Sequence, residues 1–376
     1  MTIENKRIPK VLIVGPHPPP PGGMANFIHN LESSNLRDSY EIHGFDTDYP
    51  RFLKRFRPLT LIWLPFMYLQ YYYVLRTLNP DIVHVNTPSF NSFYKHSLFV
   101  TMAKSQSLPV VLHIHGGKFK DFYDGSNESG KANISRRLRK ADRLIVLSES
   151  WREFFRTLCP DEIIRVVENG IPLDVFAPSE NLKNRKGLNF IFVGEVRSAK
   201  GMDELLDAFS QLIKKRTDWK LTIVGSGQID KYRKIVDESG ISLNVQFAGE
   251  KTGRDLTKLY SESDIFVFPS HSEGMPLVVL EAMAMKLAII ASSVGSIHEI
   301  LDKAGGILIP PKDSNALENA IESLIGNVDK INSMGGINKK TIENRFSFDR
   351  VSEQIGKIYE ELTTPSKTLK NGDSPE

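Results

Sequence analysis

Short runs of consecutive apolar residues recur along the whole chain, separated by longer segments with helical spacing of apolar positions. Six runs fall in the first half, at residues 10–15, 40–45, 81–85, 109–115, 142–148 and 163–168. Six more fall in the second half, at residues 189–195, 220–225, 245–249, 264–269, 287–292 and 306–310. Their apolar positions are largely unalternated, which is typical of parallel strands buried on both faces. The pattern therefore predicts two doubly wound α/β domains.

The segments between the runs include amphipathic helices. Apolar residues in 203–215 follow the spacing of one helix face, and those near the chain end indicate one more helix. A stretch with prolines, a glycine and a polar centre follows Ile171 and is typical of a linker. We expect this division: a first domain 1–172, a linker 173–187, a second domain 188–345, a C-terminal helix 346–364 packing back toward the first domain, and a disordered tail 365–376.

Length and composition agree with two globular domains. A single hydrophobic core rarely supports a chain of 376 residues, so two domains are expected. A composition of 40% hydrophobic and 25% charged residues excludes disorder, collagen and coiled coil as the main organisation. A net charge of +3 is too small to indicate a nucleic-acid partner. The single cysteine, Cys159, cannot build a disulfide framework or a thiolate zinc site, and the N-terminal segment lacks a secretory signal. We therefore expect a cytoplasmic protein.

One uncharged stretch and two basic clusters raise the question of membrane contact. Pro58 to Leu75 carries no charge, but its prolines and three consecutive tyrosines suit an interface better than a bilayer centre. Three interpretations stay open: helices that pack on a sheet and expose one face to solvent, a segment at a membrane surface, and, least favoured, a transmembrane helix. The basic clusters at 51–57 and 131–143 suit either an anionic membrane surface or a solvated helix face.

In the first half, the ends of two runs carry candidate ligand contacts, because open α/β sheets bind ligands at the carboxyl ends of their strands. Gly22 and Gly23 follow the first run and open a helix, so they suit close approach of a ligand to the backbone, or a proline-stiffened turn. Their spacing matches neither a dinucleotide fingerprint nor a Walker loop. His113 and His115 point to one side before a glycine pair, as ligand contacts or as buried core histidines.

In the second half, the strand ends carry charges. Arg197 and Lys200 lie between a strand and a helix, where two cations can hold a diphosphate. Gly225 opens the next turn and is weaker evidence. Glu273 lies in a loop and Glu281 eight residues later in the following helix, among apolar neighbours that indicate burial. Pro276 marks the first helical turn, where the amides of Gly274, Met275, Leu277 and Val278 would face a ligand.

Taken in order, these segments resemble the retaining glycosyltransferases of family 4, which have the two-Rossmann-domain architecture called GT-B. The matching pieces are the N-terminal glycine pair, the histidine ahead of a glycine, ENGIPLDVF at 168–176, FVGEVRSAKG at 192–201 and the E-x7-E pair. The resemblance covers residues 8 to about 362. The E-x7-E pair alone is moderately specific, whereas the ordered set is highly specific.

The resemblance implies a role for each matched residue. Glu281 would hold the nucleotide ribose, Glu273 the donor sugar near the reaction centre, and Arg197 with Lys200 the diphosphate. His115 matches the family's donor-side histidine. The remaining matches are donor contacts at Gly274, Met275, Pro276, Leu277 and Gly225, and an acceptor-side cleft at Gly22 and Gly23.

Breaking a sugar–diphosphate bond builds negative charge on the leaving phosphate, so cations and helix-terminal amides can carry most of the catalysis. No carboxylate stands out as a nucleophile, which favours a same-face, retaining displacement. The fragment Asp46-Thr47-Asp48 resembles the metal-binding D-x-D of another glycosyltransferase fold, but we interpret it as an ordinary loop and expect neither metal nor cofactor.

The sequence therefore predicts a retaining glycosyltransferase that uses a nucleotide-sugar donor and a glycan or lipid-linked acceptor. A UDP-sugar is favoured and GDP-mannose comes second, in a setting such as bacterial surface polysaccharide assembly. Two alternatives remain: a two-domain nucleotide-sugar epimerase, and a catalytically silent, membrane-associated binding protein on the same fold. The pairs Arg197/Lys200 and Glu273/Glu281 favour the transferase.

Overall fold

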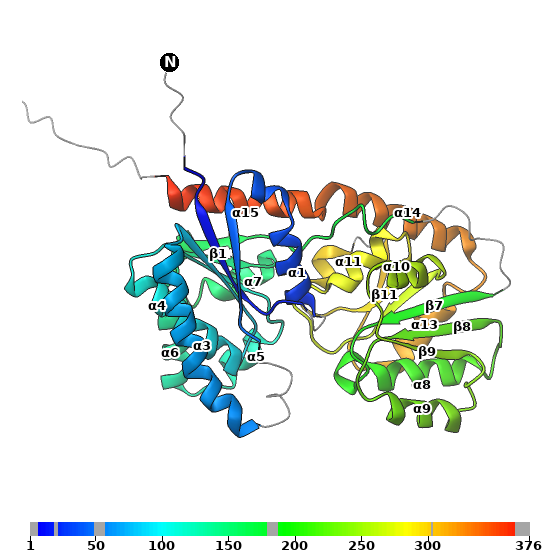
Figure 1. Ribbon diagram of the computed structural model, residues 1–376. Coiled ribbons are helices and arrows are strands. Elements are labelled where there is room, and N and C mark those ends of the chain that lie inside the picture. Colours follow the sequence, from blue (N-terminus) through cyan, green and yellow to red (C-terminus); the bar gives the residue numbers. More distant parts are fainter. Residues whose placement is uncertain (1–6, 19–21, 49–56, 179–186, 302–303, 365–376) are drawn as a thin grey trace, which may run out of the picture.

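A computed structural model describes residues 7–18, 22–48, 57–178, 187–301 and 304–364 of the chain. It contains two six-stranded parallel sheets, as predicted (Figure 1). The first has the order β2-β1-β3-β4-β5-β6 and the second β12-β11-β10-β7-β8-β9. The strands are β1 (Lys10–Gly15), β2 (Glu41–Asp46), β3 (Ile82–Thr87), β4 (Val110–Ile114), β5 (Arg143–Val146), β6 (Ile164–Val166), β7 (Leu188–Val193), β8 (Trp219–Val224), β9 (Val245–Gly249), β10 (Ile265–Phe268), β11 (Ala288–Ser292) and β12 (Gly306–Ile309).

Helices cover both faces of each sheet. In the first half they are α1 (Gly23–Glu32), α3 (Arg57–Leu78), α4 (Asn91–Ser105), α5 (Phe119–Asp124), α6 (Glu128–Leu138) and α7 (Glu149–Phe155). In the second half they are α8 (Met202–Leu212), α9 (Ile229–Glu238), α10 (Gly253–Ser261), α11 (Leu277–Ala284), α12 (Ile297–Ile300), α13 (Ser314–Glu322), α14 (Val328–Arg345) and α15 (Phe348–Thr363). Strands β3 and β11 are buried along their whole length, β11 with an almost entirely apolar sequence and β3 with the buried polar residues His84, Asn86 and Thr87.

The last helix, α15, returns to the first domain. Together α14 and α15 run along one side of both domains, with α15 over the first sheet (Figure 1). Apolar side chains of α15, including Val351 and Ile355, share a buried cluster with Val11, Phe27 and Val111. Burial of this face stabilises the first domain with residues from the far end of the chain.

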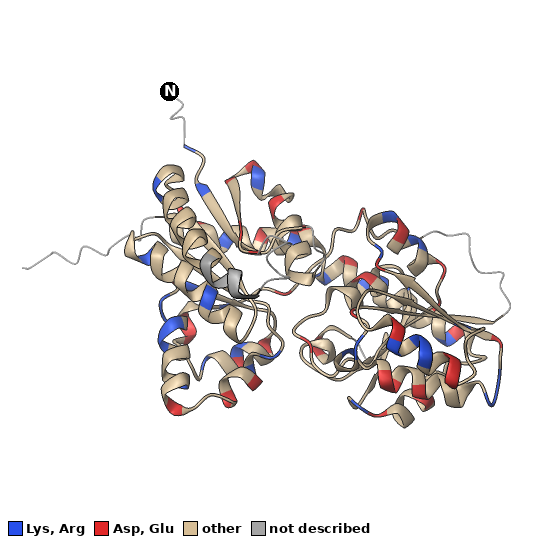
Figure 2. Cartoon of the chain, turned by 60° about the horizontal axis from the view of Figure 1, so that its bottom comes forward, with Lys and Arg blue, Asp and Glu red and all other residues tan. Residues whose placement is uncertain are grey.

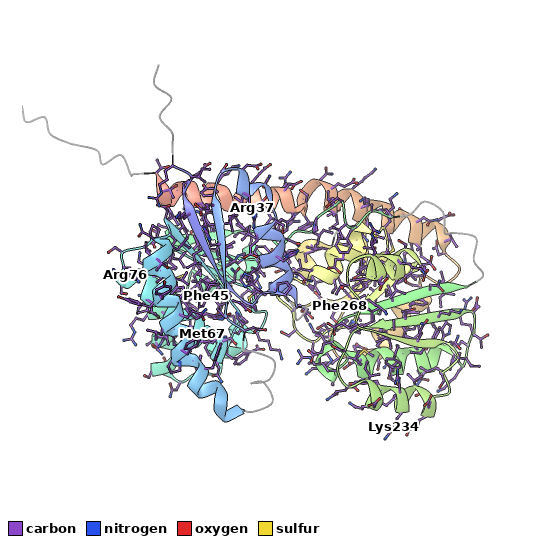
Figure 3. All side chains as sticks on the ribbon, in the orientation of Figure 1. Arg37, Phe45, Met67, Arg76, Lys234 and Phe268 are labelled. Atoms are coloured by element: carbon purple, nitrogen blue, oxygen red, sulfur yellow. The ribbon has the colours of Figure 1, made fainter. Side chains whose placement is uncertain are left out.

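The uncharged stretch forms most of helix α3, with Pro65 inside it. Met67, Tyr71 and Leu75 lie one turn apart and are buried in the core of the first domain, and Figure 3 shows Met67 beside Phe45 of that core. This agrees with the interpretation of a helix packed on the sheet. Among the residues that the structure describes, no helix is both long enough and apolar enough to cross a membrane.

The two basic clusters have different outcomes. Residues 51–56 of the first, the linker segment 179–186 and the tail from 365 lie outside the described residues. In the second, Arg137 donates to Ser97 Oγ at 2.6 Å, Arg139 to the Leu158 carbonyl at 3.0 Å and Arg143 to Glu361 at 2.8 Å. Basic and acidic side chains are interspersed on the helices of both domains (Figure 2). Several charges of 131–143 therefore tie the first domain together rather than forming a free basic face.

Candidate active site

The candidate site lies where a loop of each domain meets the other. Gly117 follows β4, and a Cβ on it would overlap the backbone of Glu273 and Gly274, which precede α11. A Cβ on Gly274 would in turn approach the His115 carbonyl oxygen closely. The two backbones approach each other so closely that these positions have no room for larger residues. This contact brings the histidine segment of the first domain against the E-x7-E segment of the second.

Lys200 and Glu273 form a largely buried ion pair. The Lys200 Nζ donates to Glu273 Oε1 at 2.5 Å, and the Ser270 hydroxyl donates to the same oxygen at 2.6 Å. The side chains of Lys200 and Glu273 are only 21% and 11% exposed. Charges that are this far removed from water are tolerated because they are paired and hydrogen-bonded. The pair places a cation and a carboxylate at the loop that leads into α11.

Arg197 is placed differently from Lys200. Its side chain is 47% exposed, and its Nε contacts Glu195 Oε2 at 2.9 Å instead of reaching Glu273. The short turn after it ends at Gly201, whose backbone is left-handed with φ +76° and lies against Pro269. The structure therefore brings Lys200, but not Arg197, into direct contact with Glu273.

Gly225 has a packing role at the end of β8. Its φ of +145° and its position against the Gly194 carbonyl oxygen leave no room for a Cβ. The strand ends after β7 and β8 therefore meet backbone to backbone.

Glu281 lies in α11 and is 7% exposed, as its apolar neighbours predicted. Tyr260 of α10 is completely buried and donates its hydroxyl to Glu281 Oε2 at 3.0 Å. Burial raises the pKa of Glu281 to about 7, although the Tyr260 hydrogen bond acts in the opposite direction. The Tyr260 hydroxyl of α10 thus holds one oxygen of the Glu281 carboxylate.

The residues ahead of α11 are also held in place. Pro276 caps the helix with extended backbone and Leu277 is the first helical residue, close to the expected start. Met275 is buried, and its carbonyl oxygen accepts a hydrogen bond from the Asn169 side chain at 2.8 Å. The Gly274 carbonyl oxygen accepts from the Ser296 amide at 2.9 Å. These contacts orient the first turn of α11, whose leading N–H groups have no partner within the helix.

His113 and His115 lie on the same side of β4, as expected, but only His115 is accessible. His113 is fully buried, whereas His115 is half-buried and its Nε2 contacts Asn86 Oδ1 at 2.9 Å. Burial first, and the nearby His84 second, lower the pKa of His115 to about 3, so this ring is neutral at ordinary pH. His115 is therefore the histidine of the pair that a ligand can reach.

The first glycine pair has open surroundings. Gly22 is the N-cap of α1 with extended backbone, and among the described residues no atom lies within 4 Å of the position that a Cβ would take on Gly22 or Gly23. Both are exposed. The described part of the fold leaves room for a side chain at either position.

The D-x-D fragment serves the first domain as a loop. Asp46 Oδ1 accepts hydrogen bonds from the backbone N–H groups of His17 at 3.2 Å and Asp48 at 2.9 Å. Within the described ranges, no three His, Cys, Asp or Glu side chains are grouped closely enough to hold a metal ion.

Four contacts of the site were not expected from the sequence. Tyr260 holds Glu281, Asn169 holds Met275, and Asn86 holds His115. Ser270, inside the recognised motif, holds Glu273. A buried tyrosine hydroxyl or asparagine amide needs a partner, but only the folded chain shows which partner it finds.

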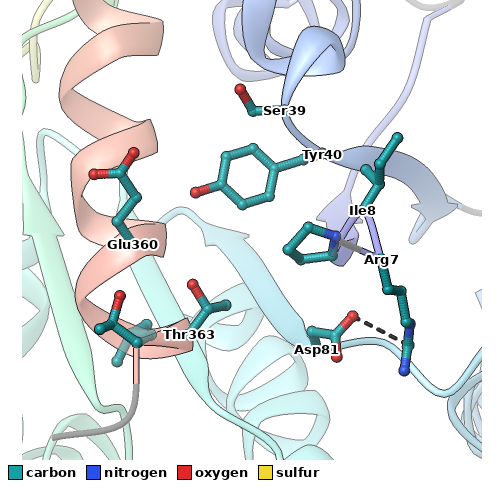
Figure 4. Close-up of a pocket in the computed structure, with 10 residues that line it drawn as sticks. Arg7, Ile8, Ser39, Tyr40, Asp81, Glu360 and Thr363 are labelled. Carbon is teal, nitrogen blue, oxygen red and sulfur yellow. Dashed lines mark hydrogen bonds and ion pairs between the residues drawn. The ribbon is translucent and has the colours of Figure 1, made fainter. Parts of the chain in front are cut away.

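A cavity of about 850 Å³ lies elsewhere, at the amino ends of the first sheet's strands (Figure 4). Arg7, which precedes β1, and Asp81, which precedes β3, pair across it at 3.3 Å. The loops that carry His115 follow the carboxyl ends of the strands. This cavity is therefore at the opposite edge of the sheet from the candidate site.

The raised pKa of Glu281 predicts a stability effect that depends on pH. Between its ordinary value of 4.5 and about 7, the folded protein holds a proton that the unfolded chain has lost, so stability falls as pH rises through this range. Glu281→Gln keeps the acceptor for Tyr260 and removes the buried charge. We expect its melting temperature to exceed that of the wild type by an amount that grows from about pH 5 to about pH 8.

Glu353→Gln, on the exposed side of α15, is the matched control and should show no such growth. Thermal unfolding followed by circular dichroism measures both variants. A difference between Glu281→Gln and the wild type that stays constant with pH would contradict the assignment.

Comparison with known proteins extends these observations. The family model described as "Glycosyltransferase Family 4" matches residues 21–175, and "Glycosyl transferases group 1" matches residues 176–341. An uncharacterized glycosyltransferase of Methanocaldococcus jannaschii is 25% identical, with 90% of this chain and 94% of that protein covered. The capsular polysaccharide biosynthesis glycosyltransferase CapM of Staphylococcus aureus is 28% identical, with 58% and 61% covered.

Solved structures share the fold over nearly the whole chain. Sucrose-phosphate synthase from Thermosynechococcus elongatus has a TM-score of 0.79 at 20% identity, covering 94% of this chain and 99% of that one. HepE of Anabaena in complex with UDP-glucose has a TM-score of 0.76 at 17% identity, with the same coverage. The two adjoining family models and the GT-B fold of these neighbours lead to one conclusion: the chain belongs to glycosyltransferase family 4, the group 1 glycosyltransferases.

Proposed function

We propose that this glycosyltransferase moves a sugar from a nucleotide-sugar donor to a glycan or lipid-linked acceptor, with retention and without a metal or cofactor. We favour a UDP-sugar as donor and place GDP-mannose second. The observation that carries the proposal is the convergence of Lys200, Glu273 and Glu281 at α11, directly against the His115 loop of the other domain. In support, the neighbour HepE is described in complex with UDP-glucose, and CapM is named for capsular polysaccharide biosynthesis.

Each charged group then has a chemical task. Glu281 accepts hydrogen bonds from the nucleotide ribose, and the first turn of α11 presents N–H groups to the donor. A bound diphosphate competes with Glu273 for the Lys200 ammonium. When Lys200 turns to the diphosphate, the Glu273 carboxylate is released to accept hydrogen bonds from the donor sugar. Arg197, which is half exposed, adds a second cation on the solvent side.

The reaction is an electrostatic one. As the bond between the anomeric carbon and the diphosphate breaks, negative charge grows on the leaving oxygen, and Lys200, Arg197 and the α11 amides stabilise it. The departing phosphate takes the proton of the acceptor hydroxyl, which attacks from the same face of the sugar. His115 is neutral and can accept or donate a hydrogen bond to a sugar hydroxyl without adding charge.

Substitutions at the two key charges test the proposal. We expect Lys200→Ala and Glu281→Ala each to abolish transfer, which for single electrostatic groups means a loss of about a hundredfold or more. Lys234→Ala is the control, since Lys234 is exposed at the edge of the second domain far from Phe268 (Figure 3). Release of UDP or GDP from a panel of nucleotide sugars, with and without a lipid-linked oligosaccharide acceptor, measures the activity.

The same assay separates the alternatives. A transferase releases nucleotide in an acceptor-dependent way, a nucleotide-sugar epimerase interconverts sugars without release, and a binding protein does neither. Wild-type rates in Lys200→Ala or Glu281→Ala would refute the assignment of these residues.

Metal independence gives a second test. Because Lys200, Arg197 and the α11 amides supply the positive charge at the leaving group, we expect full activity in excess EDTA. Activity that EDTA abolishes and Mg²⁺ or Mn²⁺ restores would overturn this part of the mechanism.

A finer proposal concerns where the enzyme meets its acceptor. If the acceptor is lipid-linked, the enzyme works in the cytoplasm, at the inner face of a membrane. Phe66, Leu69 and Tyr73 lie at i, i+3 and i+7 of α3 and are 52%, 66% and 66% exposed. They form one apolar face of the helix, on the side opposite the buried Met67. Exposed aromatic and aliphatic side chains in a row, followed by Arg76, suit a membrane interface that carries lipid-linked acceptors.

We expect the triple variant Phe66→Ser, Leu69→Ser, Tyr73→Ser to lose binding to anionic vesicles while keeping its fold. Leu243→Ser is the control, because Leu243 is 99% exposed in the second domain. Co-sedimentation with vesicles at low salt measures binding. If the wild-type protein fails to sediment with the vesicles, the proposal of membrane contact is wrong.

A further inference from the structure

Three histidine rings and a tyrosine form a continuous buried column on one face of the first sheet. Tyr359 of α15 places its hydroxyl 2.6 Å from His84 Nδ1, and His84 Nε2 lies 3.3 Å from His113 Nδ1. The His113 ring then packs against the His115 ring, with centroids 4.0 Å apart and the planes tilted by 30°. The column begins in the last helix of the chain and ends at the half-buried residue beside the α11 loop.

The arrangement follows from strand periodicity and register. His84 is in β3 and His113 in the adjacent parallel β4, where Asn86 pairs with His113. Residues two apart in a strand point to the same face, so His84 and Asn86, like His113 and His115, all face α1 and α15. Helix α15 crosses this face and supplies Tyr359.

We propose that Tyr359, His84 and His113 are positioning residues that hold His115 in its working orientation, so that α15 is a functional part of the donor site. The proposal rests on the function proposed above, in which His115 contacts the donor sugar. None of the three positioning residues touches the substrate, and each acts through the next group.

Asn86, beside the column on β3, determines which nitrogen of His115 is available, and the ring of His113 packs against His115 and holds its plane. The Asn86 amide nitrogen donates to the Val14 carbonyl oxygen at 3.4 Å, so Asn86 Oδ1 is the atom that accepts a hydrogen bond from the Nε2–H of His115. The His115 Nδ1 is then the ring nitrogen left to accept a hydrogen bond from a sugar hydroxyl. Phe27 contacts both His113 and His115, with ring centroids 5.0 and 4.9 Å away, and closes the column on its other side.

The tautomers in the column are coupled. His84 and His113 are completely buried, and burial lowers the pKa of both, so each ring is neutral with one N–H and one bare nitrogen. His84 faces a partner on each ring nitrogen. If its Nδ1 accepts a hydrogen bond from Tyr359, its Nε2 carries the proton and donates to His113; if its Nδ1 donates, its Nε2 accepts. His113 Nε2, the far end of this relay, is buried without a hydrogen-bond partner among the described residues.

Removal of the Tyr359 hydroxyl tests the column, and a matched control is available. Tyr359→Phe keeps the ring and deletes only the oxygen. Tyr40→Phe also deletes a buried hydroxyl that contacts α15, because Tyr40 donates to the Gly356 carbonyl at 3.3 Å and packs on the Tyr359 ring, but it has no bond to His84. Both variants should fold, with similar small losses of melting temperature.

The first measurement is independent of activity. Nitrogen-15 spectra of the imidazole rings report the tautomer of each histidine. We expect neutral His84 and His113 in the wild type, and ring-nitrogen shifts of both that change together in Tyr359→Phe and stay unchanged in Tyr40→Phe. A charged His84 or His113 in the wild type, or unchanged shifts in Tyr359→Phe, would overturn the column.

The second measurement uses UDP-glucose and UDP as probes. We expect Tyr359→Phe to lower kcat/KM for UDP-glucose about three- to tenfold, the size expected for one misplaced hydrogen bond, with an unchanged Kd for UDP. Equal losses in Tyr359→Phe and Tyr40→Phe, or a weakened Kd for UDP, would show a structural role only and overturn the proposal. If the wild type binds neither probe, the proposal of a UDP-sugar donor is wrong. The nitrogen-15 spectra alone then test whether Tyr359, His84 and His113 form a coupled hydrogen-bonded column.

Discussion

The relative placement of the two domains depends on a short parallel pairing between the two segments of chain that pass between them. The Ile171 amide donates to the Phe346 carbonyl, and the Phe348 amide donates to the Ile171 carbonyl. Arg345 pairs with Glu168 beside this crossing, at 2.9 Å. Because one segment leads into the second domain and the other leads out of it into α15, their pairing fixes where α11 sits relative to β4.

Contacts on both sides of the crossing reinforce this placement. Asn169, two residues before Ile171, holds the Met275 carbonyl at the start of α11. At the other side, the Glu299 carboxylate of α12 accepts hydrogen bonds from the Glu149 backbone amide and the Ser150 hydroxyl at the start of α7. The close approach of Gly117 to Glu273 is a third contact between the two domains. The charged part of the site lies within the second domain, and the domain interface adds the His115 segment to it.

The charges at the site follow from how deeply each group is buried. Lys200 and Ser270 both donate hydrogen bonds to Glu273, whereas Glu281 accepts one from the Tyr260 hydroxyl, and burial raises the pKa of Glu281 to about 7. The histidines of β3 and β4 are kept neutral by burial. At the site, the second domain thus supplies Lys200, Glu273 and Glu281, and the first domain supplies the neutral His115. This arrangement fits the nucleotide-sugar donor proposed above.

The sequence by itself determined the twelve strands, the two-sheet class and the segments that carry Lys200, Glu273, Glu281 and His115, because buried strands and strand-to-helix turns leave a local pattern. Only the tertiary structure decided that Arg197 pairs with Glu195, that Tyr260 holds Glu281, and that Tyr359 reaches His84. These partners are up to 275 residues apart along the chain. Periodicity reports which face of an element is buried, but the identity of the group that packs against that face depends on how the elements are assembled.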